Sequence, residues 1–126
     1  MTDRQLVIAA ALTLLVGVAA GAFGAHAMRD RLAPDMMAVW QTAVLYQLVH
    51  GLGMLAIAAL GSRMPSPLLT TSGTLMLAGV VIFSGSLYVL SATGIKWLGA
   101  ITPLGGLAFI VAWAMVALAA YRSADF

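Results

Sequence analysis

Four long apolar runs occupy almost the whole chain, and this pattern restricts the fold more than any other feature of the sequence. They cover residues 5–27, 36–60, 68–92 and 97–121, and none contains an Asp, Glu, Lys or Arg side chain. A helix rises about 1.5 Å per residue and the hydrocarbon core of a bilayer is roughly 30 Å thick, so about 20 residues suffice for one crossing. The sequence therefore predicts four membrane-spanning helices.

The composition of the chain supports the same interpretation. Of the 126 residues, 63% are hydrophobic and 8% are charged, and the mean hydropathy is +1.05. A soluble domain carries about 25% charged residues, so the alternative fold class, a soluble helical bundle, would need helices that are apolar on every side. The net charge of +2 forms no basic stripe for nucleic acid. Without cysteine the chain has no thiol nucleophile and no thiolate ligand for a metal.

The connections between the runs are short, which predicts one domain over residues 1–126 and an all-α, up-down-up-down transmembrane bundle. They lie at residues 28–35, 61–67 and 93–96, and short connections join antiparallel neighbours. Both termini are then expected on the same side of the membrane as connection 61–67. We call this side the termini side, and the side that holds the other two connections the opposite side.

Charge alone does not orient the bundle, and the first run has a second interpretation. The termini side and the opposite side carry three basic residues each, namely Arg4, Arg63 and Arg122 against Arg29, Arg31 and Lys96. The first run could also be a cleaved signal peptide, because small residues precede its end. Its apolar stretch exceeds the roughly 7–15 residues of a signal core, so we expect a retained span.

Polar side chains within the spans gather toward the opposite side. A count at about 1.5 Å per residue places most of them in that half, two near the midplane and one nearer the termini side. Because polar groups inside lipid are costly unless they are paired, this candidate patch is expected to face other helices. Its members are His26, Trp40, Gln41, Tyr46, Gln47, His50, Ser84, Ser86, Thr102 and Pro103.

Small residues recur at helical spacing, and we expect them to let neighbouring helices approach closely. The first run has two glycines four residues apart and a third that continues the same stripe. Further glycines lie in the third and fourth runs. The expected helix-packing residues are Gly17, Gly21, Gly24, Gly85, Gly105 and Gly106.

Pro103 lies inside the fourth run and predicts a kink in the fourth helix. Its nitrogen cannot donate a hydrogen bond to the carbonyl of Gly99, and its ring collides with that carbonyl. Gly105 and Gly106 weaken the same turn. Carbonyls freed at membrane depth are tolerated only against protein or a water-filled cavity, so a packing kink and a cavity lining both remain open.

Helical spacing in the second run places Tyr46, Gln47 and His50 on one face. A structural knot of hydrogen bonds is one interpretation, and a proton relay or ligand pocket is the other. We expect no metal site, because straight helices would separate His26 and His50 by roughly 15 Å in depth. We also expect no catalytic residue, because the acidic residues all lie outside the apolar runs and cannot complete a serine–histidine–acid set. We expect no cofactor.

Four stretches of the chain resemble one family of small membrane proteins. They are Gly21-Ala22-Phe23-Gly24-Ala25-His26, Trp40-Gln41-Thr42 with Tyr46, Gln47 and His50, Phe83-Ser84-Gly85-Ser86-Leu87-Tyr88, and Thr102-Pro103-Leu104-Gly105-Gly106 with Trp113. The chain thereby resembles the YgdD-like and transmembrane protein 256-like four-span proteins grouped as domain of unknown function 423. The resemblance implies a retained first span, a bacterial inner-membrane location and termini in the cytoplasm. It implies no particular activity.

The sequence predicts a non-enzymatic bundle in the lipid bilayer that associates with itself or with another membrane protein. The stripes of small residues and the absence of charge within the apolar runs favour this hypothesis. The alternative is an oligomeric carrier or pore for a small solute, lined by the polar patch. A lipid-binding role is a third hypothesis.

Overall fold

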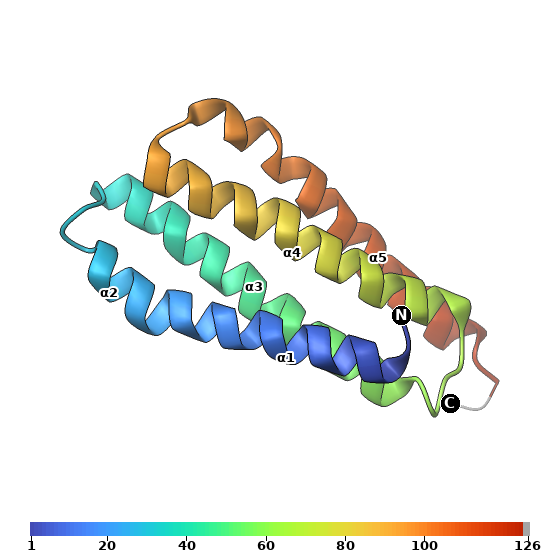
Figure 1. Cartoon of the computed structure of the whole chain (residues 1–126). Coiled ribbons are helices and arrows are strands. Elements are labelled where there is room, and N and C mark those ends of the chain that lie inside the picture. Colours follow the sequence, from blue (N-terminus) through green and yellow to red (C-terminus); the bar gives the residue numbers. More distant parts are fainter. Residues whose placement is uncertain (125–126) are drawn as a thin grey trace.

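The chain folds into four long helical segments without a strand in the computed structural model, which describes residues 1–124 (Figure 1). The segments span Asp3–Met28, Pro34–Leu60, Pro67–Thr93 and Lys96–Arg122, and each is long and apolar enough to cross a membrane. Each predicted run lies inside one of these segments. The predicted four-helix fold class is therefore confirmed, and the last two residues of the predicted domain lie outside the described part of the chain.

Two of the four segments are not uniform α-helices. The first continues from α1 through a π-helical turn, η1, into the short α2. The fourth begins with a 3-10 helix, η2, before α5. The elements are α1 (Asp3–Ala19), η1 (Ala20–Gly24), α2 (Ala25–Met28), α3 (Pro34–Leu60), α4 (Pro67–Thr93), η2 (Lys96–Ala100) and α5 (Thr102–Arg122).

Local signals in the sequence account for the helix ends. The side chains of Thr2 and Gln5 form a reciprocal capping box at the start of α1. The Ser66 hydroxyl accepts a hydrogen bond from the Leu68 backbone nitrogen at the start of α4. Gly94 ends α4 with a φ of +73°, a left-handed conformation that glycine adopts without a steric penalty. Pro34 begins α3, where its missing N–H leaves no bond unmade.

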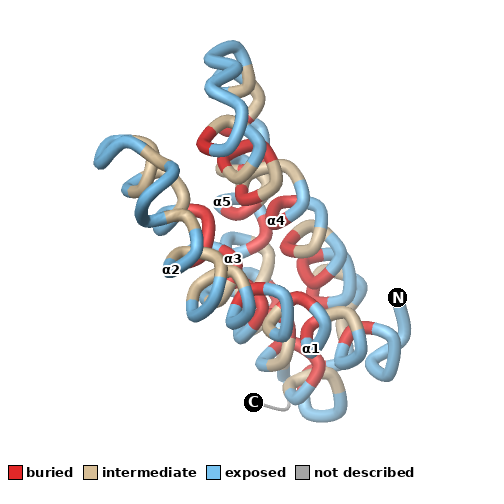
Figure 2. Tube along the Cα trace, turned by 60° about the vertical axis from the view of Figure 1, so that its left-hand side comes forward, coloured by how far each residue is buried: buried red, intermediate tan, exposed pale blue. Residues whose placement is uncertain are grey.

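The helices pack in chain order, and the start of α1 and the end of α5 lie at the same end of the bundle (Figure 1). The α3 helix contacts α1 and α4, while α5 packs chiefly on α4. Half of the residues (50%) in the most apolar stretch of α3 are buried inside the bundle. The corresponding stretches of the first and fourth spans have only 22% of their residues buried. The buried residues follow the inner sides of the helices (Figure 2). The helices α1 and α5 are therefore the outer members of the bundle.

The apolar core lies in the half of the bundle on the termini side. Its largest fully buried side chains include Met54, Met64, Leu69 and Met76. Ala10 of α1 and Ala112 of α5 belong to the same cluster and are fully buried. Interhelical hydrogen bonds and stacked aromatic rings add to this apolar core.

The fourth span is broken beside Pro103, but the break differs from the predicted kink. Pro103 occupies the first turn of α5, where a proline fits, rather than the middle of a continuous helix. The preceding η2 is linked to α5 by hydrogen bonds three residues apart, from the nitrogen of Ile101 to the oxygen of Leu98 and from the nitrogen of Leu104 to the oxygen of Ile101. The fourth span is therefore interrupted by the 3-10 helix that precedes Pro103, and not by a kink within a continuous α-helix.

The glycines after Pro103 differ in what they touch. A Cβ on Gly105 would lie 2.5 Å from the backbone nitrogen of Phe83 in α4, whereas a Cβ on Gly106 would meet only the Phe83 ring, at 3.9 Å. Gly105 therefore lets the backbones of α4 and α5 touch.

Alanine substitutions at these two neighbouring positions should separate packing from helix propensity. Gly105→Ala should lower the free energy of unfolding by about 1–3 kcal/mol, because the Phe83 backbone cannot yield as a side chain would. Gly106→Ala should be neutral or stabilising by up to about 1 kcal/mol, because alanine is the better helix former. Reversible unfolding in bicelles measures both, and equal effects at the two positions would contradict the close backbone contact.

Candidate functional site

The polar residues predicted to form one patch are distributed over several separate interhelical contacts. One contact joins α1, α3 and α4, a second joins α3 and α5, and a third joins α4 and α5. A pocket at the opposite side holds the rest.

The first contact centres on Gln47, a buried residue of α3, and we call it the Gln47 tie. The Gln47 Nε2 donates to the backbone oxygen of Thr13 in α1 at 3.0 Å. The Gln47 Oε1 accepts a hydrogen bond from the Tyr88 hydroxyl of α4 at 2.6 Å. One side chain therefore joins three helices, and both ends of its amide are used.

Trp40 lies beside the Gln47 tie and holds the π turn of the first span. Its indole Nε1 donates to the backbone oxygen of Ala20 at 3.0 Å. Its ring meets the Tyr88 ring edge-to-face, with the ring centroids 4.8 Å apart. Gly24 leaves space for the indole, since a Cβ there would lie 2.7 Å from the Trp40 ring. The sequence did not predict the π turn, because no spacing of residues marks it.

Two buried serines of α4 make the next contacts. The Ser84 hydroxyl donates to the backbone oxygen of Ala43 in α3 at 2.7 Å. The hydroxyls of Ser86 and Thr102 lie 2.6 Å apart, and either can be the donor, which joins α4 to the first residue of α5. Each of these hydroxyls forms a hydrogen bond to a neighbouring helix and is therefore not left unpaired in lipid.

His50 forms a contact between α3 and α5 that fixes its tautomer. The Trp113 indole can only donate, so the His50 Nε2, 3.0 Å away, must accept. The His50 Nδ1 lies 2.8 Å from the backbone oxygen of Tyr46 and must therefore carry the proton. The ring also stacks on Phe109, with centroids 3.5 Å apart. Both ring nitrogens are engaged, so this neutral imidazole presents no free nitrogen to a proton path or a metal.

Tyr46 and His50 lie together as the helical spacing predicts, whereas Gln47 faces other neighbours. The Tyr46 ring packs against Phe83 of α4, with centroids 4.4 Å apart, and near Phe109 of α5. Gln47 instead reaches α1 and Tyr88. Adjacent residues on a helix point about 100° apart, so the two side chains meet different helices.

The remaining predicted residues, His26 and Gln41, lie at the opposite side of the bundle. They face a pocket of about 280 Å³ between the π turn and α3. We call it the His26 pocket. Its lining residues are Gly21, Ala22, Ala25, His26, Arg29, Met37 and Gln41.

Four aromatic partners of these contacts were not among the predicted site residues. Tyr88 and Trp113 supply hydrogen bonds to Gln47 and His50, and Phe83 and Phe109 supply the stacked rings. A signal was present, because Tyr88 lies one helical turn after Ser84 and Trp113 one turn after Phe109. Sequence alone did not indicate which helix each ring would face.

The interior polar groups are already satisfied within the bundle. Among residues 1–124, no buried side-chain nitrogen or oxygen lacks a hydrogen-bond partner. The same residues contain no group of three or more His, Cys, Asp or Glu side chains that could hold a metal ion. Chemically, this arrangement fixes helices to one another.

Two grooves open on the sides of the bundle. One, of about 490 Å³, lies between α1 and α4 above α3, and we call it the α1/α4 groove. Its lining is mostly aliphatic and also includes Gly85, Gln47 and Tyr88. A second, of about 340 Å³, lies between α3 and α5 and is bordered by the rings around His50.

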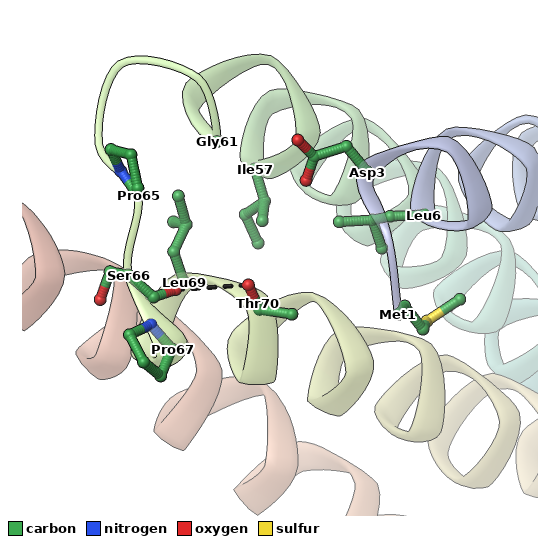
Figure 3. A pocket seen from close by; sticks show the side chains of 10 residues that line it. All are labelled: Met1, Asp3, Leu6, Ile57, Gly61, Pro65, Ser66, Pro67, Leu69 and Thr70. Atoms are coloured by element: carbon green, nitrogen blue, oxygen red, sulfur yellow. Dashed lines mark hydrogen bonds between the residues drawn. The ribbon is translucent and has the colours of Figure 1, made fainter.

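A third hollow lies at the termini side, where α1 meets the connection between α3 and α4. It has a volume of about 440 Å³. Asp3 and Leu6 of α1 line one side of it (Figure 3). Pro65, Ser66 and Pro67, where the connection meets α4, line another side. None of the polar residues predicted from the sequence lies in it.

The sequence is similar to those of a group of bacterial membrane proteins. Residues 20–106 match a family described as protein of unknown function (DUF423). The chain is 46% identical over 120 residues to the UPF0382 membrane protein YwdK of Bacillus subtilis. The aligned residues make up 94% of this chain and 98% of the relative. It is 45% identical over 119 residues to a UPF0382 membrane protein of Staphylococcus haemolyticus, with coverage of 94% and 97%. No solved structure matches the chain.

Removing the Gln47 amide should loosen the bundle. Gln47→Leu should lower the free energy of unfolding by about 1–2 kcal/mol, because two interhelical hydrogen bonds at roughly 0.6 kcal/mol or more each are lost. Tyr88→Phe should cost about 0.6 kcal/mol in the wild-type background and almost nothing when Gln47 is already leucine. Unfolding in bicelles measures the cycle.

Thr42→Val serves as the control for these variants. Thr42 lies on α3, as Gln47 does, and its hydroxyl is exposed. This hydroxyl donates to the backbone oxygen of Ala38 in α3 and makes no hydrogen bond to another helix. This variant should leave the free energy of unfolding nearly unchanged. Strictly additive effects of the Gln47 and Tyr88 substitutions would contradict the bond between them.

Proposed function

The chain belongs to the DUF423 family, and from this membership and the geometry above we propose that it is a non-enzymatic inner-membrane protein that associates with a second copy of itself. The matches cover almost the full length of both relatives, and both are named as membrane proteins. The α1/α4 groove is the observation that carries the proposal.

The groove has the chemistry of a helix-packing surface. A Cβ on Gly85 of α4 would meet nothing within 4 Å, so the α4 wall of the groove is unoccupied at this residue. A small residue at such a position lets the helix of a second copy approach closely. Leu12 and Val16 on the α1 rim are 56% and 52% exposed and present an aliphatic ridge. Two copies related by a two-fold axis can each supply a ridge to the groove of the other.

The state of the interior polar groups favours this function over a carrier or pore. A solute path needs donors and acceptors that are free to replace water around the solute. Gln47, Ser84 and Ser86 already bond to neighbouring helices. The wall of the α1/α4 groove is mainly aliphatic, which suits another protein surface within the lipid.

The proposed location is the bacterial inner membrane, with both termini in the cytoplasm. Helical spans favour the inner membrane, because bacterial outer-membrane proteins typically span as β-barrels. The side assigned to the termini follows from the family resemblance, since basic residues are equally divided between the two sides.

Single-cysteine labelling should test the orientation on a chain that has no cysteine of its own. Ser62→Cys, in the connection on the termini side, should resist a membrane-impermeant maleimide in cells with a permeabilised outer membrane. Arg31→Cys, on the opposite side, should be labelled under the same conditions. Labelling of Ser62→Cys in intact spheroplasts would reverse the proposed orientation.

Filling the α1/α4 groove should weaken self-association. Gly85→Leu should lower the dimer association constant in liposomes by about tenfold or more, roughly 1.4 kcal/mol, because its side chain occupies the space of the partner ridge. Energy transfer between labelled copies, measured over a range of protein-to-lipid ratios, gives this constant.

A matched enlargement on α5 is the control for the groove variant. Ala114 is exposed on the outer helix and lines neither groove. Ala114→Leu should therefore leave the association constant unchanged. An unchanged constant for Gly85→Leu, or a wild-type protein that stays monomeric at high protein density, would overturn self-association through this groove.

A further inference from the structure

The His26 pocket has a different chemistry from the two grooves on the sides of the bundle. Its lining residues come from the π turn, α2 and the start of α3. The α2 helix lies at the end of the bundle away from the start of α1 (Figure 1). His26, Arg29 and Gln41 all line it, so a cation, an imidazole and an amide face one space of about 280 Å³. No aspartate or glutamate is among its lining residues.

Local structure explains why a pocket exists at this place. The π turn Ala20–Gly24 widens the helix, and the Trp40 indole holds its first carbonyl at 3.0 Å. The residues of the π turn that line the pocket, Gly21 and Ala22, are both small. Gln41 faces them from α3. Small side chains on one wall and a long polar one on the other leave a hollow between two helices.

The polar side chains of the pocket are free to bind a ligand. His26, Arg29 and Gln41 are exposed, and the side-chain hydrogen bonds of the described residues nearby use Trp40, Thr42 and Gln47 instead. A guanidinium binds phosphate oxygens through two parallel N–H groups. An amide N–H and an imidazole N–H add donors beside it. Arg29 gives the lining a positive charge at any physiological pH.

The depth of the pocket also matches a phosphate. The first apolar run ends at residue 27, and the charged connection 28–35 follows at once. His26 and Arg29 therefore lie at the boundary between hydrocarbon and headgroups, where the phosphates of phospholipids reside. Asp30 and Asp35 belong to the same connection but do not line the pocket.

We propose that the His26 pocket binds a phosphate group, with Arg29 as the charged ligand and Gln41 and His26 as additional donors. A phosphate at this depth can belong to the headgroup of an anionic phospholipid or arrive free from solution. The proposal is independent of self-association, because the pocket is formed within one chain and lies away from Gly85.

Native mass spectrometry of the delipidated full-length protein in detergent tests the site. The protein is titrated separately with dioleoyl phosphatidylglycerol, with dioleoyl phosphatidylcholine and with inorganic phosphate. Saturable binding of one phosphatidylglycerol, with weaker binding of the zwitterionic lipid, would assign the phosphate to an anionic lipid. Saturable binding of inorganic phosphate would assign it to a soluble source. No saturable binding of any of the three would overturn the proposal.

Two variants test the pocket by different physical means. Arg29→Gln should weaken binding about tenfold, because it removes the charge-assisted hydrogen bonds. Ala22→Leu should weaken binding to a similar degree by filling the hollow while it keeps Arg29. Ala22 is exposed, so the larger side chain leaves the helix contacts intact.

Arg63→Gln is the charge-matched control, because Arg63 is exposed in the connection on the termini side. It should bind like the wild type, and all variants should keep the wild-type unfolding temperature. Equal weakening by Arg63→Gln and Arg29→Gln would mean that general charge attraction, and not this pocket, holds the ligand. Unchanged binding by both pocket variants would also refute the assignment.

Discussion

Lipid offers no hydrogen-bond partner, and this constraint governs the arrangement of every polar side chain inside the bundle. In this protein, backbone carbonyls of neighbouring helices accept hydrogen bonds from several of these side chains. Gln47 donates to a carbonyl of α1, Ser84 to a carbonyl of α3, and the Trp40 indole to a carbonyl of the π turn. Because each bond crosses between helical segments, satisfying the side chain also positions the helices.

Two kinds of contact hold the helices of the bundle together. Toward the termini side, methionine, leucine and alanine side chains fill an apolar core. Interhelical hydrogen bonds and stacked rings extend from His50, in the half on the termini side, to Thr102 toward the opposite side. Glycines in both halves, such as Gly73 and Gly105, leave space for a neighbouring side chain or backbone. In membranes, apolar burial gives no preference for protein over acyl chains, so close approach and polar pairing must supply the specificity.

The same geometry separates contacts that hold the fold from surfaces that remain available. His50 and Gln47 have every polar atom of their side chains engaged. The α1/α4 groove and the His26 pocket remain open, one aliphatic and one polar. Residues that were grouped as one patch by depth thus divide into those that make interhelical hydrogen bonds and those that line an exposed pocket. Self-association and phosphate binding, as proposed, use different surfaces of the bundle.

The sequence by itself determined the four spans, their order and most of their ends, because apolar length, capping residues and short connections act locally along the chain. It also located the break near Pro103 and the packing of Tyr46 beside His50, which helical spacing dictates. Only the tertiary structure decided that Pro103 begins α5 instead of bending it, that a π turn lies beneath Trp40, and that Gln47 meets Tyr88 while Tyr46 meets Phe109. Helical spacing states which residues share a face, but the identity of the facing helix depends on contacts between residues far apart in the chain.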